Sequence, residues 1–145
     1  MQSLKDVIAD PKKRRAVIDD GVAVIEAEVG DKGGLSGLAI KAAYGTVKKV
    51  KPGFVVGALH HLLDDFAGKV DPFWTSAVQG GGDPVKTFVS LGPAVSEALL
   101  SITDQRARSA AGPVRKTYDQ LRPQASKHVI EAMPRIAGLL KKHAV

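Results

Sequence analysis

The stretch DPKKRRAVIDDGVAVIEAEV, residues 10–29, decides the expected fold because it carries both a helix start and a helical repeat. Asp10 can cap the free N–H groups of a first helical turn. Pro11 at the next position loses no hydrogen bond that the helix would have supplied. Apolar residues then recur at steps of four, three and four, at Ile18, Val22, Ile25 and Val29. This spacing predicts one apolar stripe on a helix that begins near Pro11.

The same signals recur along the chain. Asp71-Pro72 and Asp83-Pro84 repeat the pair, and apolar stripes of helical period follow Pro84 and continue near the end. We expect breaks at glycine-rich residues 30–34 and 80–82, and a kink or a new helix at Pro93 and Pro134. The predicted fold is all-α: a compact bundle of six to eight short helices in a single domain, residues 1–145. The predicted helices span 3–8, 11–29, 35–50, 53–67, 72–78, 84–104, 113–121 and 124–143.

Residues 35–47 are unusual because small side chains are interspersed with larger apolar ones in a single predicted helix. Small side chains let a neighbouring helix approach closely, which favours a central packing element. The alternative interpretation is a helix that lies on a membrane surface. Its polar side would be formed by Lys41, Lys48, Lys49 and Lys51.

Charge is divided into blocks along the chain. Residues 1–51 hold ten Lys and Arg against seven Asp and Glu, which is a net +3. Residues 52–104 hold two against six, a net −4, and residues 105–145 hold nine against two, a net +7. Basic ends predict a surface for an anionic partner. The acidic centre predicts contacts with the chain's own basic parts or with a second copy.

Composition excludes several classes of protein. The chain has no cysteine, which excludes disulfides, thiol catalysis and iron–sulfur ligation and fits a reducing compartment. Its start lacks the layout of a secretory signal, and no apolar run approaches the ~18 residues of a membrane span. We therefore expect a cytoplasmic protein without an integral membrane segment.

Nine cations are the predicted contact residues for an anionic macromolecule or an acidic partner. Residues 12–15 lie at the positive end of a helix dipole, where cations are unfavourable, so helix stability does not explain them. The alternative is a solvated run that carboxylates partly offset. Nucleic acid or an acidic protein is the expected partner. The nine residues are Lys12, Lys13, Arg14, Arg15, Arg106, Arg108, Arg115, Lys116 and Arg122.

No motif fixes a reaction. His60 and Asp64, like His61 and Asp65, stand one helical turn apart, which suits two metal ligands but is more typical of His–Asp contacts. The glycine-rich segment 30–37 departs from the spacing of phosphate-binding loops and is interpreted as a connector. Nothing supports a catalytic triad. We expect no enzymatic activity, no cofactor and no metal.

Several stretches resemble an uncharacterised family of small helical bacterial proteins. They are GLSGLAIKAAY at 34–44, VKKVKP at 47–52, RKTY at 115–118, SK at 126–127 and KKHA at 141–144. The resemblance covers most of the chain. It implies an all-helical fold and a bacterial cytoplasmic setting, and it assigns no activity and no functional residue.

Three functional hypotheses follow. The first is a non-enzymatic interaction protein whose basic N- and C-terminal regions bind an anionic macromolecule or an acidic partner. The second is a carrier of a small molecule or lipid, with an apolar cavity between helices 35–47 and 53–67. Phe54, Phe66, Phe73 and Trp74 would line that cavity, unless they simply fill the core. The third is self-association into a homo-oligomer through acidic and basic surfaces.

Overall fold

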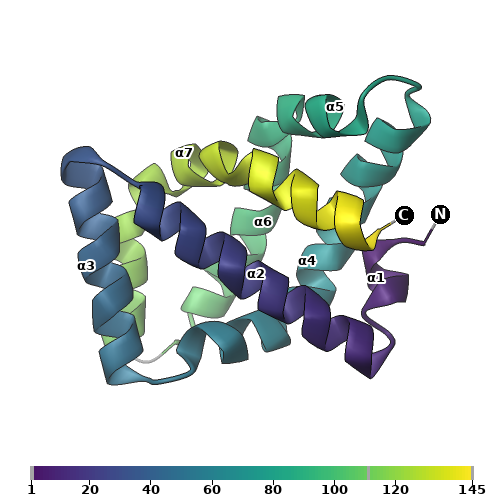
Figure 1. Cartoon of the computed structure of the whole chain (residues 1–145). Helices are drawn as coiled ribbons and strands as arrows, with labels where there is room; N and C mark the ends of the chain where they lie inside the picture. The colour runs from purple at the N-terminus through teal and green to yellow at the C-terminus, as the bar shows by residue number, and fades with distance from the viewer. Residues whose placement is uncertain (1, 111, 145) are drawn as a thin grey trace.

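The computed structural model describes residues 2–110 and 112–144 (Figure 1). Within these residues the chain forms seven helices and no strand, which confirms the all-α prediction and the expected number of helices. The helices are α1 (Leu4–Val7), α2 (Pro11–Asp31), α3 (Gly34–Val50), α4 (Phe54–Gln79), α5 (Pro84–Ser90), α6 (Gly92–Ala107) and α7 (Gly112–His143).

Two of the three Asp-Pro pairs start a helix as predicted. Asp10 accepts a hydrogen bond from the backbone N–H of Lys12 at 2.9 Å, and Pro11 begins α2. Asp83 accepts from the N–H of Val85 at 3.0 Å at the start of α5. In both places the carboxylate satisfies an N–H group that the helix itself leaves without a partner.

The prediction that a helix starts at Asp71-Pro72 is wrong, because α4 runs unbroken through Pro72. The Asp71 carboxylate instead caps a different helix. It accepts hydrogen bonds from the N–H of Leu4 at 2.7 Å and of Lys5 at 3.0 Å, at the first turn of α1. Buried residues on either side of Pro72, such as Val70 and Trp74, hold α4 together across the missing backbone hydrogen bond.

Prolines also divide α5 from α6 but leave α7 whole. The predicted single helix over 84–104 ends at Ser90 and restarts at Gly92 with Pro93 in its first turn, and the two parts differ in direction by 67°. That outcome confirms the expectation for Pro93. Pro123 and Pro134 lie inside α7, so the predicted helices 113–121 and 124–143 are one helix with no new start at Pro134.

The apolar core lies at the end of the molecule where the N- and C-termini meet (Figure 1). Phe88 of α5 is completely buried, and its ring packs against the Trp74 ring of α4 in a T-shaped arrangement with 5.7 Å between the centroids. The Trp74 indole N–H donates to the backbone carbonyl of Ala144 at 3.0 Å, which fixes the end of the chain against the core. Met133, Ala137 and Leu140 of α7 complete the packing.

The prediction that residues 35–47 form a central packing element is wrong. Helix α3 lies at the edge of the molecule opposite the termini (Figure 1), and none of its described apolar side chains is fully buried. One small residue does permit a close approach. A Cβ atom on Gly37 would lie 2.5 Å from the carbonyl carbon of Lys32, so this glycine accommodates the turn between α2 and α3.

Across residues 2–110 and 112–144, no single helix has both the length and the apolar character needed to cross a bilayer. The bent pair of α5 and α6 reaches that length and composition only when its two helices are taken together.

Candidate functional site

A hollow with a volume of about 360 Å³ lies between α2, α4 and α7. Its walls are almost entirely aliphatic. Contributions come from α2 (Val24, Ile25, Val29), α4 (Leu59, Leu63, Phe66) and α7 (Val129, Ala132, Ile136). The volume lies within the range of about 300–1,000 Å³ that is typical of small-molecule sites.

Helices α2 and α4 approach each other closely at the wall of the hollow. A Cβ atom on Gly21 of α2 would lie 3.2 Å from a methyl carbon of Leu59 in α4, so the glycine lets the two helices approach at this point. Beyond Gly21, the apolar side chains Val24, Ile25 and Val29 of α2 are only half buried. They line open space instead of interlocking with a facing helix, and the apolar stripe predicted for α2 therefore forms a cavity wall in this part of the helix.

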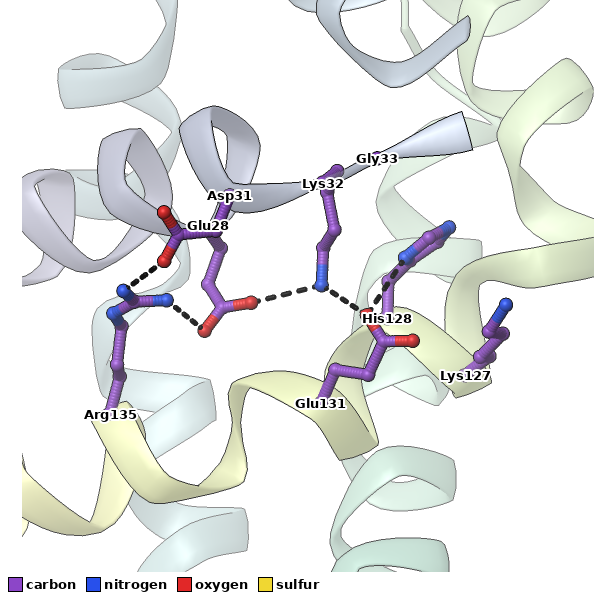
Figure 2. Close-up of a pocket in the computed structure, with 8 residues that line it drawn as sticks. All are labelled: Glu28, Asp31, Lys32, Gly33, Lys127, His128, Glu131 and Arg135. Carbon is purple, nitrogen blue, oxygen red and sulfur yellow. Dashed lines mark hydrogen bonds and ion pairs between the residues drawn. The ribbon is translucent and has the colours of Figure 1, made fainter. Parts of the chain in front are cut away.

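One end of the hollow is charged. Glu28, Lys32 and His128 line both the apolar hollow and an adjoining polar pocket of about 300 Å³. Figure 2 shows the side chains of α2 and of the α2–α3 turn pointing toward those of α7. An apolar chamber that ends in a compact group of donors and acceptors matches the usual composition of a ligand site.

Lys32 is at the centre of this charged group. Its side chain is only 8% exposed, and its ammonium group lies 2.7 Å from Glu131 and 2.9 Å from Glu28. Arg135 binds the other oxygen of Glu28 at 2.8 Å and also pairs with Asp31. The pairs join the C-terminal end of α2 to the middle of α7 and connect residues about a hundred positions apart in the sequence.

The charge states of the group follow from these contacts. Burial alone lowers the pKa of Lys32, but hydrogen bonds to Glu131 and Glu28 outweigh it, so the pKa is raised. Lys32 in turn lowers the pKa of Glu131. Burial, together with the nearby charge of Lys32, lowers the pKa of His128. At neutral pH this cluster therefore contains an ammonium ion, a carboxylate and a neutral imidazole.

These charge states favour binding over covalent chemistry. A lysine acts as a nucleophile through its neutral amine, and the two carboxylates keep Lys32 protonated. What the cluster offers is a charged donor beside carboxylate acceptors at the end of an apolar chamber. Glu131 is the more accessible carboxylate, with 43% of its side chain exposed against 13% for Glu28.

Among the described residues, no hydrogen bond or ion pair joins His60 to Asp64 or His61 to Asp65. Arg14 donates to His60 Nδ1 and also binds Asp64, each at 3.2 Å, while Asp65 lies 3.5 Å from Arg106. In the described part of the chain, no group of three or more His, Asp and Glu side chains is placed to hold a metal ion.

The structure places the nine predicted contact cations in two groups. Four form ion pairs: Arg14 with Asp64, Arg106 with Asp65, Arg122 with Asp104, and Arg115 with Asp119. The first three join different helices, so the acidic centre does contact the chain's own basic parts. Among the described residues, the other five are exposed and form no ion pair: Lys12, Lys13, Arg15, Arg108 and Lys116.

The four aromatic residues predicted to line a cavity occupy three different environments. Phe66 lines the apolar hollow, and Phe54 lines a second hollow of about 460 Å³ beside α6 and α7. Trp74 is in the core and Phe73 packs against it. The 360 Å³ hollow is therefore not enclosed between α3 and α4, since Ile40 is the only described side chain of α3 in its wall.

Comparison with known proteins places the chain in a family. Residues 4–144 match the family of unknown function DUF6918. The chain belongs to this family. Neither the curated proteins nor the solved structures contain a significant match. The DUF6918 match extends over all seven helices of the chain, and it agrees with the resemblance seen in the sequence to an uncharacterised helical family.

Sequence reasoning missed the charged cluster of this DUF6918 member. Lys32 lies in the glycine-rich segment whose sequence predicts a connector, and no motif marks the distant Glu131. One local signal was present. Glu28 and Lys32 stand four residues apart, which is the spacing of an ion pair on a helix.

Proposed function

We propose that this protein binds an elongated, largely apolar small molecule, such as a fatty acid, in the hollow between α2, α4 and α7. The observation that supports this most directly is the continuity of an aliphatic chamber with a charged cluster at one end. The apolar part of the ligand would replace water against the aliphatic walls, which is favourable by about 25 cal/mol per Å² of apolar surface covered.

The polar end group would lie at the Lys32 cluster. Lys32 lines the chamber and stays protonated, so it suits a carboxylate or another acceptor. An incoming carboxylate would compete with Glu131, because that side chain is the more exposed of the two Lys32 partners. The neutral His128 beside it adds a polar atom without adding charge.

Displacement of a fluorescent fatty acid by laurate tests the proposal. Ala132→Leu adds bulk to the wall of the hollow and should weaken probe binding by roughly ten-fold or more while the protein stays folded, since filling a cavity is commonly stabilising. Ala23→Leu is the matched control on the exposed face of α2, and it should leave binding unchanged. The proposal is wrong if the probe does not bind, or if both variants bind like wild type.

A second candidate function is the binding of an anionic macromolecule by the first turn of α2. Lys12, Lys13 and Arg15 are exposed there, and within the described residues they form no ion pair. Binding to duplex DNA should weaken steeply as salt rises. The triple substitution to glutamine should abolish it, while the paired Arg115→Gln should change it little. Binding that does not respond to salt would contradict this second function.

A further inference from the structure

Helix α3 carries the two most exposed large apolar side chains among the described residues. Leu35 is 88% exposed and Leu38 is 65% exposed. With Ala39 and Ala42, which are also exposed, they form an apolar stripe at helical spacing along the N-terminal half of α3. A surface helix normally directs its apolar face to the core and its polar face to solvent. An apolar stripe that faces solvent instead indicates an interaction site.

The charge of α3 indicates what kind of partner fits. The helix contains no Asp or Glu, and Lys41, Lys48 and Lys49 are all exposed, with Lys51 just after it. The ammonium group of Lys48 forms an ion pair with Glu26 at 3.7 Å. In the part of the chain that the structure describes, Lys41, Lys49 and Lys51 form no ion pair. The face is therefore apolar and cationic together, which complements an apolar surface that carries negative charge.

The shape of α3 selects among partners with that chemistry. Helix α3 lies at the edge of the molecule (Figure 1), and Leu35 and Leu38 of the stripe are largely exposed to solvent. A protein partner would need a groove that fits two protruding leucines. A bilayer accepts them between its headgroups, while the aliphatic stems of flanking lysines extend along the apolar region and keep their ammonium groups at phosphate level.

We infer that the outer face of α3 docks on an anionic lipid bilayer, with Leu35 and Leu38 inserted and Lys41 and Lys49 beside the phosphates. This inference does not rest on ligand binding in the hollow. The two sites are nevertheless close, because Lys32 at the end of the hollow also lines the depression formed by Leu35, Leu38 and Lys41. Docking in this orientation would bring the charged end of the hollow to the lipid surface.

Co-sedimentation of the full chain with vesicles tests the inference. We expect binding to phosphatidylcholine vesicles that contain phosphatidylglycerol and much weaker binding to pure phosphatidylcholine. The double variant Leu35→Ser/Leu38→Ser should lose roughly ten-fold or more in affinity. Lys41→Gln/Lys49→Gln should remove most of the preference for the anionic lipid. The matched control is Val78→Ser, an exposed apolar residue at the end of α4, and it should bind like wild type.

Three outcomes would overturn the inference. The first is absence of binding to either kind of vesicle. The second is equal binding by wild type and the leucine double variant when circular dichroism shows both to be folded. The third is a homodimer in light scattering that the double variant dissociates, without vesicle binding, because the stripe would then pair with a second copy.

Discussion

The two halves of this protein are built on different interactions. The packed half holds the core that joins α1, α5, the starts of α2 and α6, and the ends of α4 and α7, with Phe88, Val95 and Met133 fully buried. The open half comprises residues 19–62 and 103–132. Where the structure describes burial in those ranges, Lys32 and Gly37 are the only buried residues.

Polar contacts between helices hold the open half. Tyr44 of α3 donates to Glu26 of α2 at 2.8 Å, and burial together with Glu26 raises the pKa of Tyr44 to about 12. Asp104 of α6 binds Arg122 of α7 at 2.7 Å and also accepts from the Tyr118 hydroxyl. Apolar side chains of this half, such as Val24 and Ile25, line the 360 Å³ hollow together with core residues such as Val17 and Leu63.

The largest expected effect comes from an apolar truncation in the packed half. Phe88→Ala should lower the free energy of unfolding by about 3–5 kcal/mol, since the side chain is fully buried against Trp74. Ile25→Ala, in the wall of the hollow and in the open half, should cost only about 1–2 kcal/mol because that side chain is only half buried. Urea unfolding measures both. Equal losses would show that the two halves do not differ in packing.

A smaller effect is expected when the charge at the centre of the open half is removed. Lys32→Met keeps the aliphatic stem but takes away one partner each from Glu28 and Glu131, and we expect a loss of about 2 kcal/mol. Lys41→Met, at an exposed position of α3, is the control and should change stability by less than about 0.5 kcal/mol. A Lys32→Met protein as stable as wild type in urea unfolding would refute the role given to these ion pairs.

The smallest expected effect is a dependence of stability on pH. Burial near Lys32 lowers the pKa of His128, so the unfolded chain binds a proton more readily than the folded one. Neutral His128 contributes fully to folding stability above about pH 6.5, which is its pKa in the unfolded chain. This contribution is lost as the pH falls toward the lower pKa of His128 in the folded protein. Thermal unfolding should show the melting temperature dropping a few degrees in that window.

His128→Gln should remove this first decline. A second and steeper drop in melting temperature is expected below about pH 4 and should remain in this variant. There Glu131, Asp20 and Asp104 become protonated and lose the ion pairs that lower their pKa values. A decline just below pH 6.5 that persists in His128→Gln would assign it to another group.

The parts of the fold that could be predicted from the sequence depend on neighbours within one or two turns. Asp10 and Asp83 cap the helices that follow them, and Pro93 ends one helix and starts another. Asp71 has the same local sequence but a different role, since its partners are Leu4 and Lys5 at the other end of the chain. Local pattern alone does not distinguish a cap for its own helix from a cap for a distant one.

The candidate site was harder to predict from the sequence than the fold was. The residues of the cluster come from two helices, and the 99 positions between Lys32 and Glu131 leave no periodic signal. A hollow was expected between α3 and α4, and the 460 Å³ hollow does have Val47 and Phe54 in its wall, whereas the 360 Å³ hollow with the charged end lies between α2, α4 and α7. Helix crossing points depend on how whole faces fit, which a single stripe of apolar residues does not specify.

The sequence by itself determined that this chain is helical, where most of its helices begin, and that its charge is separated into basic ends and an acidic centre. Backbone hydrogen bonding and capping act over a few residues, which is why those features can be read directly. Only the tertiary structure decided which apolar faces meet and which stay apart, and so placed a protonated lysine at the end of an aliphatic hollow. Side chains from distant segments are buried against one another or left exposed together, and which of these happens depends on the packing of the whole chain.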